Sequence, residues 1–217
     1  KHCMVIGGGL AGAAAAASLA RRGWQVQMLD QAAEPAAGAS GLPAGVFAPH
    51  VSPDDAVLSR LSRSGVRTTL QQASQRLQAG QDWGPTGVLE HRTDGTPGLP
   101  ADWQQGPGAD WTIPAPESAR AQAGLPPDAV ACWHNRAGWI RPPQLVRALL
   151  REPGVTWRGQ CAVASLRPMP GADATAPKEL QALDAQGQVL AQAPVVVIAA
   201  GAGSPSLLAE RWPLQPV

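Results

Sequence analysis

Three glycines near the N-terminus have the spacing of a phosphate-binding turn. Gly7, Gly9 and Gly12 form a GxGxxG sequence between a short apolar run and an alanine-rich stretch. In such a turn the first glycine permits a sharp bend, the second lets a pyrophosphate approach the backbone, and the third lets a helix pack on a strand. The N–H groups that open the helix, those of Leu10 and Ala11, have no acceptor inside it and lie at the positive end of its dipole. This pattern predicts a dinucleotide site.

Asp30 is the second residue with a chemical role in this pattern. The segment 24–29 alternates apolar and polar residues, which predicts a strand, and the stretch 10–22 before it has a strong helix propensity. With a first strand at 3–6 they form a βαβ unit of about thirty residues. The carboxylate that ends the second strand can accept hydrogen bonds from both ribose hydroxyls of adenosine. A lone GxGxxG can be a chance glycine turn, but this context favours a dinucleotide site.

A second glycine-rich loop favours FAD over NAD, since both cofactors share the first fingerprint. Gly38, Ala39, Ser40 and Gly41 follow soon after the predicted βαβ unit. In flavoproteins a segment of this kind lies along the pyrophosphate and leads to the isoalloxazine ring. The loop 31–53 is also too long for a simple connection, which makes it a functional candidate. The sequence therefore predicts bound FAD.

The elements that follow belong to a mixed α/β chain. Asp54 and Asp55 are expected to cap a helix that runs to Gln78. The segment 82–137 is rich in loops, and a helix is expected at 142–150, where two prolines can open it. The expected further strands are 86–91, 130–133, 155–157, 163–166, 180–185, 189–191 and 195–199.

We therefore expect an α/β fold: a Rossmann-like FAD-binding domain with an inserted, partial α+β substrate lobe. Residues 1–81 and 141–217 would form the FAD-binding domain, and residues 82–140 the lobe. The last strand enters a glycine turn shortly before the sequence ends, and no initiator Met precedes the first strand. We expect a fragment that is truncated at its C-terminus.

Composition argues against several other classes of protein. A formal charge of +1 is too small to indicate nucleic-acid binding by itself. No run of about eighteen apolar residues could cross a bilayer, so we expect a cytoplasmic protein with no membrane partner. Cys3, Cys132 and Cys161 are odd in number and far apart, which argues against a disulfide framework. The four histidines lack the spacing of metal ligands, so no metal is expected.

Four stretches of the chain resemble the D-amino-acid oxidase superfamily of FAD-dependent oxidoreductases. They are VIGGGLAGAAAAASLARRGWQVQMLD, AAGASGLPAGVFAPHVSPDDAVLSRLSRSG, GWIRPPQLVRALL and VVVIAAGAGSPSLL, in that order. The second stretch is most similar to the FAD-dependent C-terminal half of the bifunctional proteins of tRNA 5-methylaminomethyl-2-thiouridine biosynthesis. Two positions depart from that group: Leu42 replaces a polar residue, and Ala48 a histidine, with His50 following two positions later.

The resemblance implies FAD chemistry on a secondary amine. FAD would oxidise the C–N bond of a carboxymethylaminomethyl group on the wobble uridine of tRNA, and water would release glyoxylate and leave an aminomethyl group. The electrons would pass to oxygen or to another acceptor. The partner would be tRNA or a small amine substrate, and a methyltransferase domain could precede this one in the same gene.

The resemblance also implies roles for individual residues. Gly7, Gly9, Gly12 and Asp30 would hold the ADP half of FAD, and the loop from Gly38 to Gly41 would follow the pyrophosphate and ribityl chain. Residues near the flavin ring would be Gly45, Val46 and Phe47. The backbone of Val163 would meet the adenine, and a second turn at the end of a strand would close over the cofactor with Ala200, Gly201 and Ala202.

Several polar and aromatic residues have both a functional and a structural interpretation. His50 could lie over the flavin and tune substrate protonation, but a histidine in a proline-rich loop is more often a packing residue. Arg141 could bind a carboxylate or simply mark the start of the following helix. Three arginines at helical spacing could contact tRNA phosphates or simply form a solvated helix face: Arg60, Arg63 and Arg67. Three tryptophans could stack on a base or form the core of the inserted lobe: Trp83, Trp103 and Trp111.

Three functions remain open at this stage. The leading hypothesis is an FAD-dependent oxidoreductase acting on CH–NH groups in tRNA wobble-uridine modification. The second is a small-molecule amino-acid or glycine oxidase of the same superfamily. The third is a fragment that binds FAD without turnover.

Overall fold

The computed structural model describes residues 1–169 and 179–208, which form two compact units. The first unit comprises Lys1–Pro43 and Pro142–Val217, and the second comprises Ala44–Arg141. The expected division placed residues 44–81 with the FAD-binding domain instead. They join the second unit because strand β3 (Gly45–Phe47) pairs with strand β8 (Gly138–Ile140). Residues 209–217, the end of the expected FAD-binding domain, lie outside the described residues.

A parallel sheet forms the centre of the first unit. Its order is β13-β1-β2-β9, with β1 at His2–Ile6, β2 at Gln25–Leu29, β9 at Val155–Arg158 and β13 at Val196–Ile198. All three pairings are parallel. A parallel strand buried on both faces is apolar along its length, and four of the five residues of β1 are buried.

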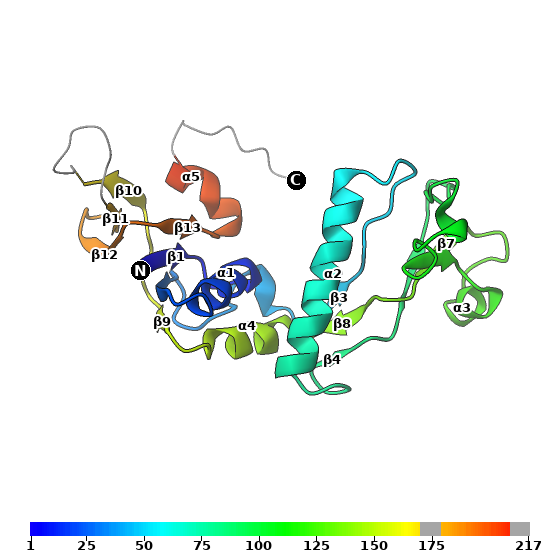
Figure 1. The fold of residues 1–217 in the computed structure, drawn as a ribbon, viewed down its shortest axis with the longest axis horizontal. Helices are drawn as coiled ribbons and strands as arrows, with labels where there is room; N and C mark the ends of the chain where they lie inside the picture. Colours follow the sequence, from blue (N-terminus) through cyan, green and yellow to red (C-terminus); the bar gives the residue numbers. More distant parts are fainter. Residues whose placement is uncertain (170–178, 209–217) are drawn as a thin grey trace. The chain divides into compact units, whose positions relative to one another are not determined.

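Helices cover one face of this sheet. Helix α1 (Leu10–Ala20) lies beside helix α4 (Pro142–Leu150) in Figure 1, and the two helices pack against each other. The alanines of α1 let it approach the strands closely: Ala16 and Ala20 pack with Cys3, Val5 and Met28. The expected helix at 142–150 is confirmed with the same bounds.

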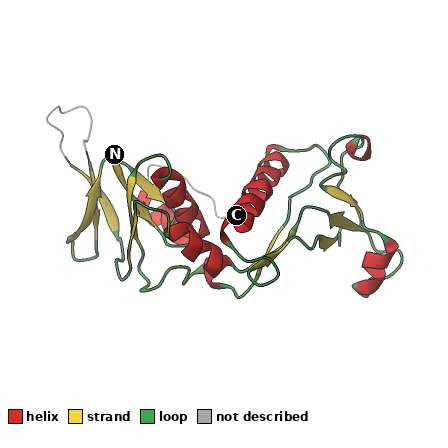
Figure 2. Ribbon diagram, turned by 60° about the horizontal axis from the view of Figure 1, so that its bottom comes forward, coloured by secondary structure: helices red, strands yellow, loops and turns green. Residues whose placement is uncertain are grey.

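An antiparallel three-stranded sheet covers the other face. It consists of β10 (Ser165–Pro168), β11 (Leu180–Leu183) and β12 (Val189–Ala193) in sequence order. Met4 and Leu29 point to this side and pack with Ala182, so successive residues of β1 alternate between the two cores. Figure 2 shows the strands in yellow beside the red helices of this unit. A short 3₁₀ turn, Gly201–Gly203, and helix α5 (Ser204–Leu208) follow β13.

The second unit contains two small antiparallel sheets and a long helix. One sheet has the order β3-β8-β4, where β4 is Trp83–Gly84. The other has the order β5-β7-β6, formed by Val88–His91, Ala131–His134 and Thr112–Pro114. Helix α2 spans Val57–Arg76, and the shorter α3 spans Glu117–Gln122.

The start of α2 differs from the sequence-based expectation. Its N-cap is Ala56, and neither Asp54 nor Asp55 caps the helix. Asp55 has a positive φ of 46°, and both its carboxylate oxygens bind Arg63, at 2.7 and 3.0 Å. The N–H of Ala56 is bound instead by Ser52 Oγ at 3.1 Å. Asp55 is therefore engaged by Arg63, eight residues later in the sequence, and does not cap the helix.

Candidate dinucleotide-binding site

The turn between β1 and α1 is closed by two glycines that cannot be replaced without a clash. Gly7 has a φ of +113°, and a Cβ there would lie 2.2 Å from the carbonyl oxygen of Ala199. A Cβ on Gly12 would lie 1.9 Å from the carbonyl oxygen of Gly7. Real Cβ contacts are essentially never shorter than 3.0 Å. The first glycine thus lets the end of β1 approach the backbone after β13, and the third brings α1 into direct backbone contact with the end of β1.

The N-terminus of α1 presents donors at this turn. The first bond within the helix runs from the N–H of Ala13 to the carbonyl of Gly9, at 2.9 Å. The N–H groups of Leu10 and Ala11 therefore have no acceptor inside the helix. Leu10 donates to Ser40 Oγ at 2.9 Å. Because a serine hydroxyl can accept and donate at once, Ser40 keeps a proton for an anion at the helix end.

The second glycine-rich loop folds back onto the first. Ala39–Gly41 form a 3₁₀ turn, and the N–H of Ala36 donates to the carbonyl of Gly8 at 3.0 Å. A Cβ on Gly41 would lie 2.7 Å from the carbonyl oxygen of Ala36, so the loop is compact at this glycine. The loop thus brings the predicted residues Gly38 to Gly41 to the opening of α1.

The Asp30 carboxylate is held by two backbone donors. Oδ2 accepts from the N–H of Gly8 at 2.6 Å, and Oδ1 accepts from the N–H of Ala32 at 2.8 Å. Each carboxylate oxygen has a further lone pair, so both can still accept a ligand hydroxyl. The part played by Gly8 was missed in the sequence, although it stands between two fingerprint glycines.

A cavity of about 260 Å³ opens beside Asp30. Gly7, Val163 and Ala200, all expected to contact a cofactor, line it together with Asp30. This is slightly below the range of roughly 300–1,000 Å³ for whole-ligand pockets, which suits one nucleoside of a dinucleotide. The lining also includes residues that the sequence did not single out: Gln31, Cys161, Gly203, Ser206 and Leu207. The proximity of Cys161 to Val163 in the sequence was the signal that could have found it.

The remaining predicted residues of this unit lie in the turn after β13. Gly201, with a φ of +57°, and Ala202 belong to the 3₁₀ turn next to the lining residues Ala200 and Gly203. A positive φ strains any residue with a Cβ, which is the reason for a glycine here.

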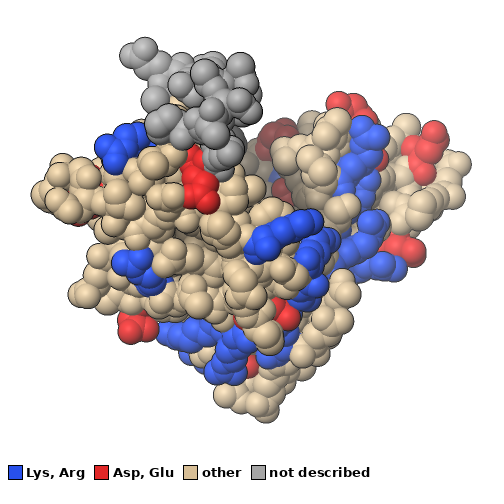
Figure 3. All heavy atoms as spheres, turned by 60° about the vertical axis from the view of Figure 1, so that its left-hand side comes forward, with Lys and Arg blue, Asp and Glu red and all other residues tan. Residues whose placement is uncertain are grey.

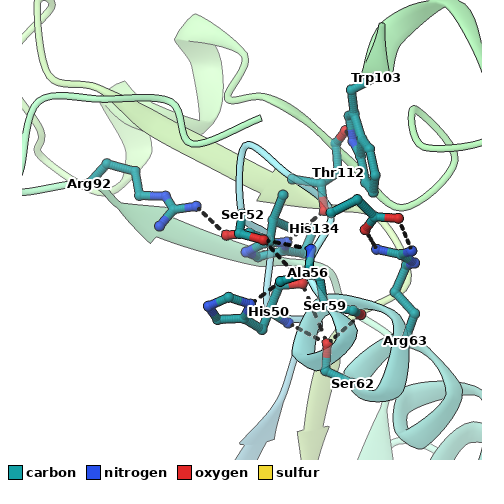
Figure 4. A network of polar contacts seen from close by, with 12 residues as sticks. His50, Ser52, Ala56, Ser59, Ser62, Arg63, Arg92, Trp103, Thr112 and His134 are labelled. Carbon is teal, nitrogen blue, oxygen red and sulfur yellow. Dashed lines mark hydrogen bonds and ion pairs between the residues drawn. The ribbon is translucent and has the colours of Figure 1, made fainter. Parts of the chain in front are cut away.

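Four predicted residues belong to the second unit. Gly45, Val46 and Phe47 form β3, where Val46 is 70% exposed and Phe47 is buried. His50 is exposed, and its ring Nδ1 lies 3.0 Å from Ser59 Oγ (Figure 4). Their roles at a flavin ring stay predictions.

Three tryptophans of the second unit are core residues. Trp83, Trp103 and Trp111 are all buried, so none offers an open face to a base. The interpretation as the core of the lobe is therefore favoured over base stacking. Arg141 is exposed and directly precedes α4.

Other kinds of site find little support in the described part of the chain. Within residues 1–169 and 179–208, no group of three or more His, Cys, Asp or Glu could hold a metal ion. None of the described helices is both long and apolar enough to cross a membrane. The three cysteines are free and buried.

Comparison with known proteins identifies one family over nearly the whole chain. The family model described as FAD dependent oxidoreductase matches residues 2–217. A protein of Verminephrobacter eiseniae named tRNA 5-methylaminomethyl-2-thiouridine biosynthesis bifunctional protein MnmC is 68% identical over 221 residues, which is all of this chain and 35% of that protein. A protein of the same name from Paracidovorax citrulli is 58% identical and covers 99% of this chain and 34% of its own length. The chain thus spans about a third of these relatives.

Solved structures share the fold at low identity. Glycine oxidase from Geobacillus kaustophilus matches with a TM-score of 0.68 and 21% identity, over 95% of this chain and 56% of that one. L-proline dehydrogenase from P. horikoshii matches with a TM-score of 0.72 and 19% identity, over 96% of this chain and 55% of that one. At such identities the likeness concerns the fold alone.

Proposed function

This chain belongs to the family of FAD dependent oxidoreductases, and on that premise we propose that it oxidises a carboxymethylaminomethyl group on the wobble uridine of tRNA. The supporting observation is the relative that is 68% identical over the entire chain and carries the name of a tRNA 5-methylaminomethyl-2-thiouridine biosynthesis protein. The bond to be cleaved is the C–N bond of a secondary amine. The products are glyoxylate and an aminomethyl uridine.

The residues of the first unit fit the ADP half of FAD. Gly7 and Gly12 allow the sharp turn and the close packing of α1 on β1, and Gly9, the second glycine of the fingerprint, lets a pyrophosphate reach the backbone. The N–H of Ala11 and the hydroxyl of Ser40, which itself accepts from the N–H of Leu10, supply donors to it. Asp30, already fixed by two backbone N–H groups, accepts from the ribose hydroxyls. The cavity beside it takes the adenosine.

Further residues are proposed to contact the cofactor on the basis of the family resemblance. The loop Gly38–Gly41 follows the pyrophosphate and the ribityl chain. The backbone of Val163 meets the adenine, and the turn of Ala200, Gly201 and Ala202 closes over the cofactor. The residues that we propose to lie near the flavin ring are Gly45, Val46 and Phe47.

FAD, when bound, supplies the two-electron oxidation of the C–N bond, and the protein supplies binding and orientation. His50 is the candidate catalytic residue. Its Nδ1 is held by Ser59, a fully buried serine, which fixes the ring and leaves Nε2 to hold a proton of the substrate amine. The backbone N–H of His50 donates to Ser62 Oγ at 2.9 Å and anchors the same loop to α2.

The proposal extends to partners and location. The relatives are named bifunctional and are about three times as long as this chain, so we propose that a second catalytic domain, a methyltransferase, shares the polypeptide. A tRNA substrate places the reaction in the cytoplasm.

The test is the nucleoside composition of tRNA in a strain that lacks the gene. We expect the carboxymethylaminomethyl form to accumulate, and the plasmid-borne gene to restore the aminomethyl-derived form. The matched variants are Gly12→Val, which fills the contact between helix and strand, and Gly65→Ala, where a Cβ meets nothing within 4 Å. Gly65→Ala should restore the modification and Gly12→Val should not. An unchanged nucleoside profile in the deletion strain would refute the tRNA assignment.

A second measurement separates an enzyme from a mere flavin binder. Purified FAD-loaded protein should lose its flavin absorbance when hypomodified tRNA is added without oxygen. Glycine and sarcosine serve as controls and should leave the flavin oxidised. Bleaching by glycine but not by tRNA would instead indicate a small-molecule amine oxidase.

A further inference from the structure

One tryptophan of the second unit carries two arginines. The guanidinium carbon of Arg67, on α2, lies 4.9 Å from the ring centroid of Trp111, and that of Arg136 lies 5.1 Å from the same centroid. Trp111 is only 5% exposed. Both distances are within the range of about 6 Å for attraction between a cation and an aromatic ring. The ring thus holds two positive charges near each other, although like charges repel.

A neighbouring tryptophan, Trp103, also has an arginine over its ring, but the charge of that arginine is neutralised by a carboxylate. Arg63 lies 5.2 Å from the centroid of Trp103, and its guanidinium forms a bidentate pair with Asp55. This pair holds the pKa of the Asp55 carboxyl below its ordinary value. Gly108 packs closely on the Trp103 ring, where a Cβ would lie 2.3 Å from it. Arg63 therefore has a structural role and is not available to a ligand.

Arg67 and Arg136 remain available to an anion. Within the described residues no carboxylate forms an ion pair with Arg67, and its side chain is exposed. Arg136 approaches Asp110 only at 3.7 Å, and both side chains are about half exposed or more. Exposed pairs of this kind contribute little, about 0–1 kcal/mol. On the face of the molecule shown in Figure 3, blue Lys and Arg side chains and fewer red Asp and Glu side chains are separated by large uncharged areas.

A cavity of about 380 Å³ adjoins these groups, and its charges are unevenly placed. Arg67 and Trp111 line it together with Trp103 and Asp102. The Asp102 carboxylate repels an anion, whereas the guanidinium on Trp111 attracts one. The lining also includes Asp55 and Arg63, which bind each other, so Arg67 is the guanidinium of this lining that is left for an anion. A guanidinium stacked on a ring has its N–H fork already oriented, and this fork matches the oxygens of a phosphate.

We propose that Arg67 and Arg136, held on Trp111, bind the phosphodiester backbone of the RNA substrate. This inference rests on the proposed function for the identity of the ligand. It gives the second unit a part in binding the backbone of the RNA. The Trp111 ring orients both guanidinium groups in the free protein, so that they can bind neighbouring phosphates without being reoriented.

The experiment measures the affinity of the FAD-loaded protein for hypomodified tRNA as a function of KCl concentration. The main variant is Arg67→Gln with Arg136→Gln. Loss of two charged contacts should weaken binding at least about tenfold and reduce the slope of log affinity against log salt by roughly 1 to 2. Arg136→Gln alone, at an exposed position, should show part of both effects and guards against misfolding of the double variant.

Two further variants sharpen the result. Arg76→Gln removes one charge from the same helix, nine residues after Arg67 and hence on its opposite side, and should bind within about twofold of the unchanged protein. Asp102→Asn removes the repelling carboxylate and should tighten binding. A double variant that binds tRNA as well as Arg76→Gln overturns the inference, and so does an Asp102→Asn variant that binds more weakly.

The two proposals fail in different ways. If the unchanged protein binds tRNA, loses affinity with the double variant, but shows no flavin bleaching, the proposed reaction is wrong and the RNA surface stands. If the flavin bleaches with tRNA and the double variant has an unchanged KM and salt dependence, the RNA surface is wrong and the reaction stands. If the protein binds no tRNA, the RNA surface is wrong as well.

Discussion

The contact between Gly12 and Gly7 offers the sharpest test of the dinucleotide site. Replacing Gly12 with Ala places a Cβ 1.9 Å from the Gly7 carbonyl oxygen, with the Met28 side chain at 3.3 Å on another side. The clashing atom is backbone, so no side-chain rotation can relieve it. The opening of α1 must move away from β1 by about 1 Å or more to restore a real contact distance.

The free energy cost of that movement can be estimated. Overpacking that shifts backbone costs roughly 1–3 kcal/mol, while the change from glycine to alanine inside a helix returns about 1 kcal/mol. Helix α1 cannot slide freely, because Ala13, Ala16 and Ala17 are fully buried. We expect a net loss of up to about 2 kcal/mol in the free energy of unfolding, which lowers Tm by up to roughly 8 °C.

The larger effect should be on the cofactor. The same shift displaces the N–H groups of Leu10 and Ala11, so the affinity for FAD should fall by at least about tenfold, which corresponds to about 1.4 kcal/mol. Flavin fluorescence measures this affinity, and thermal unfolding without FAD measures the stability. Gly65→Ala is the control, since its Cβ meets nothing within 4 Å and helix propensity alone should stabilise α2 by about 1 kcal/mol or less. If Gly12→Ala binds FAD as tightly as the unchanged protein, the turn does not hold the pyrophosphate.

Three further changes test other parts of the structure. Asp30→Asn keeps the shape of the side chain but turns one acceptor into a donor that faces a backbone N–H. The affinity for FAD should therefore fall about tenfold to a hundredfold. An FAD titration identical to that of the unchanged protein would show that Asp30 does not bind the ribose. His50→Gln should slow anaerobic flavin reduction by tRNA with little effect on FAD affinity, and an equal rate would remove His50 from the reaction. Burial lowers the pKa of His134 below its ordinary value of 6.5, so the unfolded chain binds a proton that the folded chain does not, and stability should fall as the pH falls below about 6.5. His134→Gln should lose this part of the pH dependence in denaturant titrations between pH 5 and 8, and an identical pH profile would contradict the assignment.

Local sequence patterns were sufficient for the first unit's central elements. The apolar run of β1, the alanines of α1 and the alternation of β2 lie within thirty residues, and the expected bounds differ from the observed ones by one or two residues. The fingerprint glycines were found for the same reason: a sharp turn and a close approach demand a particular residue type at a particular spacing.

Where elements meet partners far away in sequence, the patterns were weaker. Leu58, Leu61 and Val66 lie at roughly helical spacing along α2, yet Leu58 and Leu61 are exposed and Val66 is buried. Asp55, which was expected to help cap α2, binds Arg63 instead, and the N-cap of the helix is Ala56. Apolar residues at helical spacing predict that a helix forms, but here they did not predict which face of the helix is buried by other elements.

The sequence by itself therefore determined the βαβ unit, the glycine turn, the family and the cofactor, because these depend on residue types at short and fixed spacing. Only the tertiary structure decided that Gly8 holds Asp30, that β3 pairs with β8 and that Arg67 and Arg136 share the ring of Trp111. These contacts join residues from 22 to 95 positions apart. Which distant groups meet is settled by packing and hydrogen bonding of the whole chain, and no local pattern of residue types records that choice.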